Sequence, residues 1–154
     1  MNSPIQGPRW LATIFVTIAT LGLLLTALAK VLTLTGSARR LVTPDPVFAF
    51  LSVRQLMTLG TCLEIMVAGV GFSRLPIRTK CAALAWLSSL FLFYRFGRWY
   101  FGVTEPCGCL GDIWQWLPLS RQSLESGLFA FLVVVWVGSW ISILNKGRSC
   151  EGAG

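Results

Sequence analysis

The sequence predicts an all-α integral membrane protein: one domain over residues 1–154, folded as a four-helix bundle of transmembrane helices. Three observations lead to this class. The chain is 55% hydrophobic and only 12% charged, whereas an ordinary soluble domain is about 25% charged. Its hydrophobic residues gather in four segments, and its charges stand mostly at the ends of these segments. This distribution is typical of helices that are surrounded by lipid.

The first segment covers residues 10–34 and holds one charge, Lys30, near its end. As a helix that rises about 1.5 Å per residue, it is long enough to cross a hydrocarbon core of about 30 Å. A cleaved signal peptide is the competing interpretation, because residues 27–29 read Ala-Leu-Ala. The apolar stretch is longer than the usual signal-peptide core of about 7–15 residues. We therefore expect a retained span.

The second segment is predicted as a helix over residues 47–72. Asp45 is expected to cap it, with Pro46 in the first helical position. Glu64 lies inside this segment, and an ionisable group within an apolar span is a functional candidate that needs a partner. Lys30 or Arg95 is expected to reach it from a neighbouring helix. An ion pair that fixes helix packing is favoured over a role in proton transfer.

The third segment, residues 81–103, is the weakest of the four. Its first 14 residues are uncharged and mostly apolar, and then Arg95 and Arg98 intrude. Both arginines are expected to extend towards the lipid headgroups, where the aromatic residues 99–101 would form a belt. We therefore expect a span here as well.

The fourth segment, residues 124–144, carries no charge beyond Glu125. Four spans place both termini on one side of the membrane. The short connection between the second and third segments holds Arg74, Arg78 and Lys80, and short basic connections stay in the cytoplasm. The expected protein is thus a multi-pass protein of the cell membrane with both termini cytoplasmic. The connection between the third and fourth segments is then extracytoplasmic.

This last connection contains two thiols, Cys107 and Cys109, separated by Gly108. Pro106 and the glycine allow the two sulfurs to lie close together. A disulfide between them would close a very small ring, and strain favours exchange over a purely structural role. The chain has no histidine, so the candidates for the positive charge that favours a thiolate are Arg95, Arg98 and Arg121. The pair is the predicted catalytic site.

Several other interpretations of the two cysteines stay open. They include an inert disulfide, two unpaired thiols and a soft-metal site, although the connection offers no further Cys, His or Met ligand. The sequence therefore gives no evident metal or cofactor. The net charge of +7 is assigned to contact with the anionic surface of the lipid bilayer and not to nucleic acid, because the basic residues form no stripe.

Three short motifs resemble the MauE/DoxX-like membrane proteins, specifically the methylamine-utilisation MauE type. They are Ala29-Lys30, Leu63-Glu64 and the Pro-Cys-Gly-Cys-Leu-Gly motif at residues 106–111. The resemblance implies a redox-associated four-helix membrane bundle that takes part in disulfide maturation of extracytoplasmic proteins, beside a thioredoxin-like or other thiol protein. MauE-type proteins are linked to maturation of methylamine dehydrogenase, although nothing in this sequence identifies methylamine metabolism. The alternative function is a non-catalytic assembly subunit of a larger membrane complex.

Overall fold

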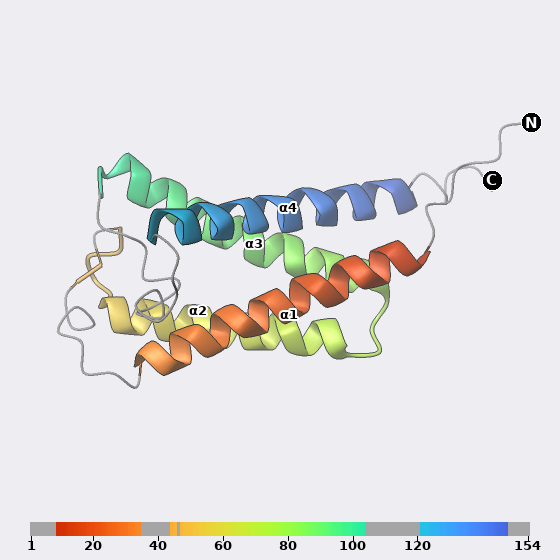
Figure 1. Cartoon of the computed structure of the whole chain (residues 1–154), viewed down its shortest axis with the longest axis horizontal. Coiled ribbons are helices and arrows are strands. Elements are labelled where there is room, and N and C mark those ends of the chain that lie inside the picture. The colour runs from red at the N-terminus through yellow and green to blue at the C-terminus, as the bar shows by residue number, and fades with distance from the viewer. Residues whose placement is uncertain (1–8, 35–43, 46, 104–120, 148–154) are drawn as a thin grey trace, which may run out of the picture.

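The computed structural model describes residues 9–34, 44–45, 47–103 and 121–147. Within them the chain is all-helical, as predicted, with four helices (Figure 1). Their bounds are α1 Arg9–Leu34, α2 Val53–Phe72, α3 Ile77–Tyr100 and α4 Arg121–Gly147. Three of them, α1, α2 and α4, are long and apolar enough to cross a membrane. With 24 residues, α3 has the length but not the composition.

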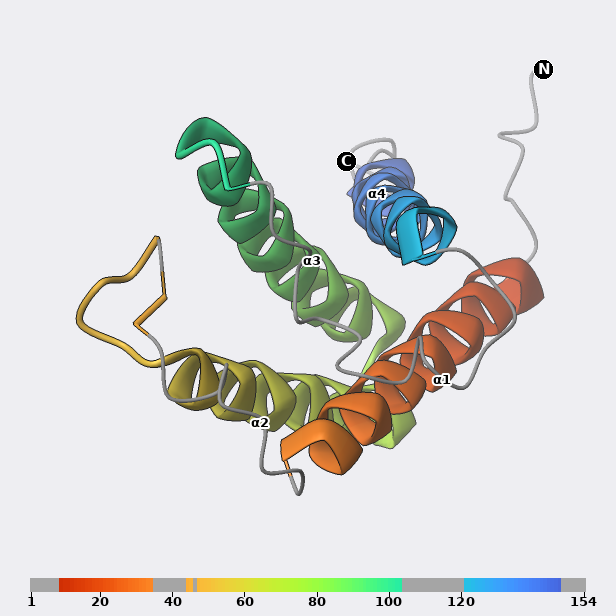
Figure 2. The same cartoon turned by 60° about the vertical axis from the view of Figure 1, so that its left-hand side comes forward.

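Successive helices run in opposite directions along the bundle (Figure 1). The turn between α2 and α3 lies at one end, together with the start of α1 and the end of α4. The opposite end, where α2 begins and α3 ends, is called the Asp45 end here. The closest packing is between α1 and α2 and between α3 and α4, so the bundle consists of two helix pairs (Figure 2).

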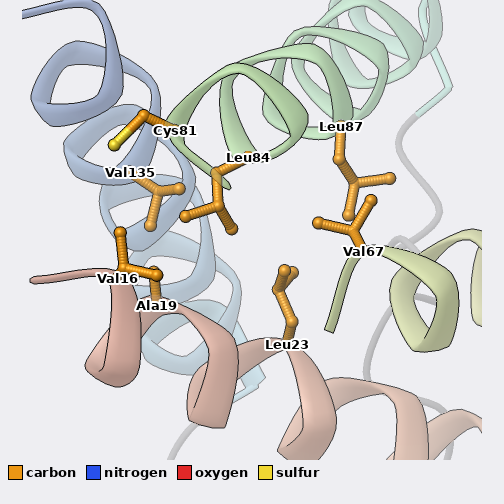
Figure 3. Packing of buried hydrophobic residues seen from close by; sticks show 8 residues of the cluster. All are labelled: Val16, Ala19, Leu23, Val67, Cys81, Leu84, Leu87 and Val135. Carbon is orange, nitrogen blue, oxygen red and sulfur yellow. The ribbon is translucent and has the colours of Figure 1, made fainter. Parts of the chain in front are cut away.

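A hydrophobic core lies where the two helix pairs meet (Figure 3). All four helices contribute to it, and its buried members are Val16, Ala19, Leu23, Val67, Cys81, Leu84, Leu87 and Val135. The outer faces of the helices are apolar too, with Leu25, Met66 and Phe93 among the exposed side chains. Extensive exposed apolar surface marks a contact with a membrane or a partner. This surface fits a lipid bilayer.

Two phenylalanines bring α1 and α4 together by packing onto glycines. The ring of Phe15 in α1 lies against Gly138 in α4, and the ring of Phe131 in α4 lies against Gly22 in α1. A Cβ atom on Gly138 would come within 2.6 Å of the Phe15 ring. Small residues allow such close approach, which is common between membrane helices.

The predicted start of the second helix is wrong. The helix begins at Val53 rather than at residue 47, and Ser52 rather than Asp45 is its N-cap. The Ser52 hydroxyl accepts from the Gln55 N–H at 3.3 Å, and the Gln55 side chain accepts from the Ser52 N–H at 2.9 Å. This reciprocal capping box satisfies two backbone donors that the first turn otherwise leaves unpaired.

The other helix boundaries differ less from the predicted ones. The first helix gains one residue, since it begins at Arg9. The third begins at Ile77 instead of residue 81, and it ends three residues earlier than predicted, at Tyr100. The fourth extends by three residues at each end, to Arg121–Gly147. The start of α3 and both ends of α4 thus include polar residues that the prediction assigned to the connections.

Replacing Ser52 with alanine is expected to lower the free energy of unfolding by about 1 kcal/mol, because the cap is lost. Chemical denaturation of the purified protein in detergent micelles, followed by helical circular dichroism, measures this change. Thr58→Ala in the same helix is the control, since that hydroxyl donates only to the carbonyl of Arg54 in its own helix. An equal loss in both variants would contradict the capping role.

Candidate functional site

The centre of the candidate site is an ion pair between α1 and α2. Lys30 Nζ lies 2.5 Å from Glu64 Oε1. Their side chains are only 6% and 2% exposed. The hydroxyl of Thr26 lies 3.2 Å from the same carboxylate oxygen. Of the two partners expected for Glu64, Lys30 therefore makes the contact.

Helical spacing brings these polar groups together. Thr26 and Lys30 are four residues apart, so they lie on one face of α1. Glu64 shares the buried face of α2 with Thr61 and Ala68, and α1 and α2 run antiparallel (Figure 1). Glu64 is the twelfth of the 20 residues of α2. Glu64 therefore lies near the middle of an apolar helix, where an isolated charge is costly, and Lys30 contacts it from near the end of α1.

A small cavity of about 20 Å³ adjoins the ion pair. All four helices line it, mostly with apolar side chains. Its lining residues are Leu23, Thr26, Lys30, Glu64, Phe91, Tyr94, Arg95, Leu128, Phe131 and Leu132. The cavity thus lies between the four helices and is partly open, with polar lining residues from α1, α2 and α3 and only apolar ones from α4.

Arg95 lines this cavity but makes its contact elsewhere. Its guanidinium lies over the ring of Phe129 in α4, 5.3 Å from the ring centroid. Lys30 has a similar arrangement, since its ammonium group lies 4.7 Å from the centroid of the Phe91 ring. Such cation–π contacts stabilise both cations. The Lys30 contact is buried, whereas the Phe129 ring under Arg95 is exposed. The structure thus places two cations and one carboxylate around one cavity.

Asp45 has a role other than the predicted helix cap. Its carboxylate accepts from the N–H groups of Val47 and Phe48, at 2.8 and 3.1 Å. Its second oxygen accepts from the Tyr94 hydroxyl of α3 at 2.6 Å. Asp45 is only 1% exposed, so it ties the segment before α2 to α3 at the Asp45 end of the bundle.

Sequence reasoning missed four contributors to this site: Asp45 as a tertiary contact, Tyr94, Thr26 and Phe91. The Asp-Pro pair does indicate a turn held by the aspartate side chain, so the local role of Asp45 could have been predicted from the sequence. Its contact with Tyr94 joins residues 49 positions apart, and no local pattern predicts such a pair.

The predicted catalytic cysteines, Cys107 and Cys109, lie outside the described residues. Two other cysteines are described, and both have free thiols. Cys62 is exposed on α2, whereas Cys81 is buried at the start of α3. In the described part of the chain, no group of three or more Cys, Asp or Glu side chains is placed to hold a metal ion.

Fold and site together define an all-helical protein with three helices fit to cross a membrane and a buried Lys–Glu pair between two of them. Comparison with models of known protein families, with curated proteins and with solved structures finds no match.

Proposed function

We propose that the chain is a four-span membrane protein that exchanges disulfides with an extracytoplasmic thiol protein through Cys107 and Cys109. One observation supports this above all: the two ends of α3 lie at opposite ends of the bundle (Figure 1). The basic turn with Arg74 precedes α3, and the segment with the two cysteines follows it. If the basic turn is cytoplasmic, the cysteine segment begins on the oxidising side, where disulfides form.

This topology requires α3 to cross the membrane although it is the least apolar of the four helices. Its 24 residues reach about 36 Å, more than the hydrocarbon core requires. The helix is buried through Cys81, Leu84 and Leu87, while Arg95 and Arg98 lie in its last two turns. Long cationic side chains near a helix end extend to the headgroups, so Arg98 is compatible with a span. Arg95 lines the cavity instead, and the Phe129 ring stabilises its guanidinium.

The proposed exchange conserves atoms and electrons. One of the two cysteines attacks a disulfide of the partner as a thiolate, which forms a mixed disulfide and releases one partner thiol. The other cysteine attacks this mixed disulfide, so that Cys107 and Cys109 become joined and the partner is left as a dithiol. Two electrons pass to the partner. The same steps in reverse oxidise the partner, and the MauE-type resemblance is consistent with either direction.

The topology predicts which cysteines a membrane-impermeant maleimide reaches in intact cells. After mild reduction, Cys107 and Cys109 are expected to react from outside. Cys150, which follows α4 in the sequence, is expected to react only after lysis. Single-cysteine variants keep the signals separate. The reverse pattern would place the cysteine segment in the reducing cytosol and contradict the proposal.

Replacing either Cys107 or Cys109 with serine is expected to trap or abolish a mixed disulfide with the partner, because one of the two exchange steps is blocked. Non-reducing electrophoresis of cell extracts after acid quenching detects the adduct, and its loss on reduction identifies it as a disulfide. Cys62→Ser is the control and should behave as the unaltered protein. If neither variant changes the adducts or the redox state of extracytoplasmic thiol proteins, the assembly-subunit alternative gains support.

A further inference from the structure

We propose that the interior cavity is a binding site for one water molecule, which bridges Glu64 to Arg95. This inference is independent of the cysteines and of the proposed exchange. It would extend the Lys30–Glu64 pair into a charged triad with a member on each of α1, α2 and α3. The bridge would therefore connect the α1–α2 pair to the α3–α4 pair through polar contacts.

The carboxylate of Glu64 provides the first reason. Its Oε1 is occupied by Lys30 and Thr26, whereas its Oε2 is buried and has no protein donor among residues 9–34, 44–45, 47–103 and 121–147. A buried carboxylate oxygen without a donor is costly, because it has lost its hydrogen bonds to water and gained none in return. Glu64 also lines the cavity, and the proposal places the missing donor for this oxygen there.

The size and lining of the cavity provide the second reason. About 20 Å³ exceeds the roughly 10–15 Å³ that one water molecule needs, and a buried water also needs about two to four polar partners. Glu64 offers an acceptor, the Arg95 guanidinium offers donors, and Lys30 retains ammonium protons beyond the one donated to Glu64. The lining is otherwise mostly apolar, so a water would depend on these few side chains for its polar partners. The cavity is large enough for one water and too small for most organic ligands.

The charges around the cavity favour a neutral guest that both donates and accepts. Lys30, Arg95 and Glu64 sum to one positive charge. The α4 residues that line the space, Leu128, Phe131 and Leu132, carry none. A proton on Glu64 would leave two cations without a counter-charge, and an anion would meet the carboxylate. Water avoids both penalties because it donates to Glu64 and accepts from Arg95.

Radiolytic hydroxyl labelling of the full chain in lipid nanodiscs tests this inference, because ionising radiation generates hydroxyl radicals from bound water. Leu23 and Leu132 line the cavity and are only 4% and 8% exposed. Leu84 and Leu87 do not line it and are each 1% exposed. We expect labelling several-fold higher at the first two leucines than at the second two. Equal, background labelling at all four would overturn the water site.

Substitutions at Arg95 test the bridge itself. Arg95→Met is expected to reduce labelling at Leu23 and Leu132 to the level of Leu84, and Arg95→Lys, which keeps a charged donor, should retain part of it. Arg54→Met on the exposed start of α2 is the matched control and should change nothing. Circular dichroism verifies that each variant is folded. Undiminished labelling in a folded Arg95→Met variant would overturn the bridging role, and if that variant does not fold, the leucine contrast still decides whether water is bound.

Discussion

Replacing Lys30 with methionine is expected to lower the free energy of unfolding by about 3–5 kcal/mol, since removal of one partner leaves the other charge buried and uncompensated. The carboxylate left behind belongs to Glu64, which is 2% exposed near the middle of α2. Methionine keeps most of the length of lysine, so loss of packing contributes little. Denaturation in detergent micelles, followed by helical circular dichroism, gives the free energy.

A double-mutant cycle separates the ion pair from the packing of its side chains. Glu64→Met alone is expected to be as damaging as Lys30→Met. The double variant should recover most of the loss, because well-packed apolar residues often replace a buried ion pair without cost. Lys80→Met, at the half-buried start of α3, is the control for the substitution. Additive losses in the double variant would show that the two side chains act independently.

Replacing Gly71 with alanine is expected to cost about 1–3 kcal/mol through overpacking between α1 and α2. A Cβ atom at this position would clash first with the hydroxyl oxygen of Thr20, and it would lie 2.9 Å from Thr20 Cγ2 and 3.2 Å from Thr20 Cβ. Thr20 cannot easily move, because it is buried and its hydroxyl donates to the Val16 carbonyl at 2.7 Å. The thermal unfolding midpoint in micelles measures the loss.

Gly69→Ala is the matched control for this substitution. Gly69 lies in the same helix, and a Cβ atom there would meet nothing within 4 Å. Because alanine is favoured over glycine inside a helix by about 0.5–1 kcal/mol, this control is expected to be neutral or slightly stabilising. Thr20→Ala should partly rescue Gly71→Ala, because it removes both the hydroxyl and the methyl group that the new Cβ atom would meet. Equal effects at Gly71 and Gly69 would show that the helices separate without penalty.

Much of the fold was predictable because its main signal is local. Long apolar runs identified all four helices, and lipid-facing apolar residues make such runs easy to find. The error at the start of α2 arose from reading the Asp-Pro pair at residues 45–46 as a helix start. The sequence contains the better signal one turn before the apolar run, since Ser52 and Gln55 are spaced as a capping box. The capping box of Ser52 and Gln55 marks the observed start of α2, whereas the Asp-Pro pair lies in the segment before it.

The candidate site was predictable in part, because an ionisable residue in an apolar span must find a partner. That rule singled out Glu64 and restricted its partner to Lys30 or Arg95. The choice between them depends on the register in which α1, α2 and α3 pack, which the sequence does not state locally. Tyr94 and Asp45 were missed for the same reason. The cysteine pair remains a prediction, since Cys107 and Cys109 lie outside the described residues.

The division of the bundle into two helix pairs has a consequence for biogenesis. In the chain α1 and α2 precede α3 and α4, so they are synthesised before them, and these two helices carry both partners of the buried ion pair. A single charged residue at the centre of an inserting helix costs about 3 kcal/mol. If α1 and α2 enter lipid as a hairpin, Lys30 and Glu64 enter it as one neutral unit, and α3 and α4 then assemble against a hairpin whose charges are already paired.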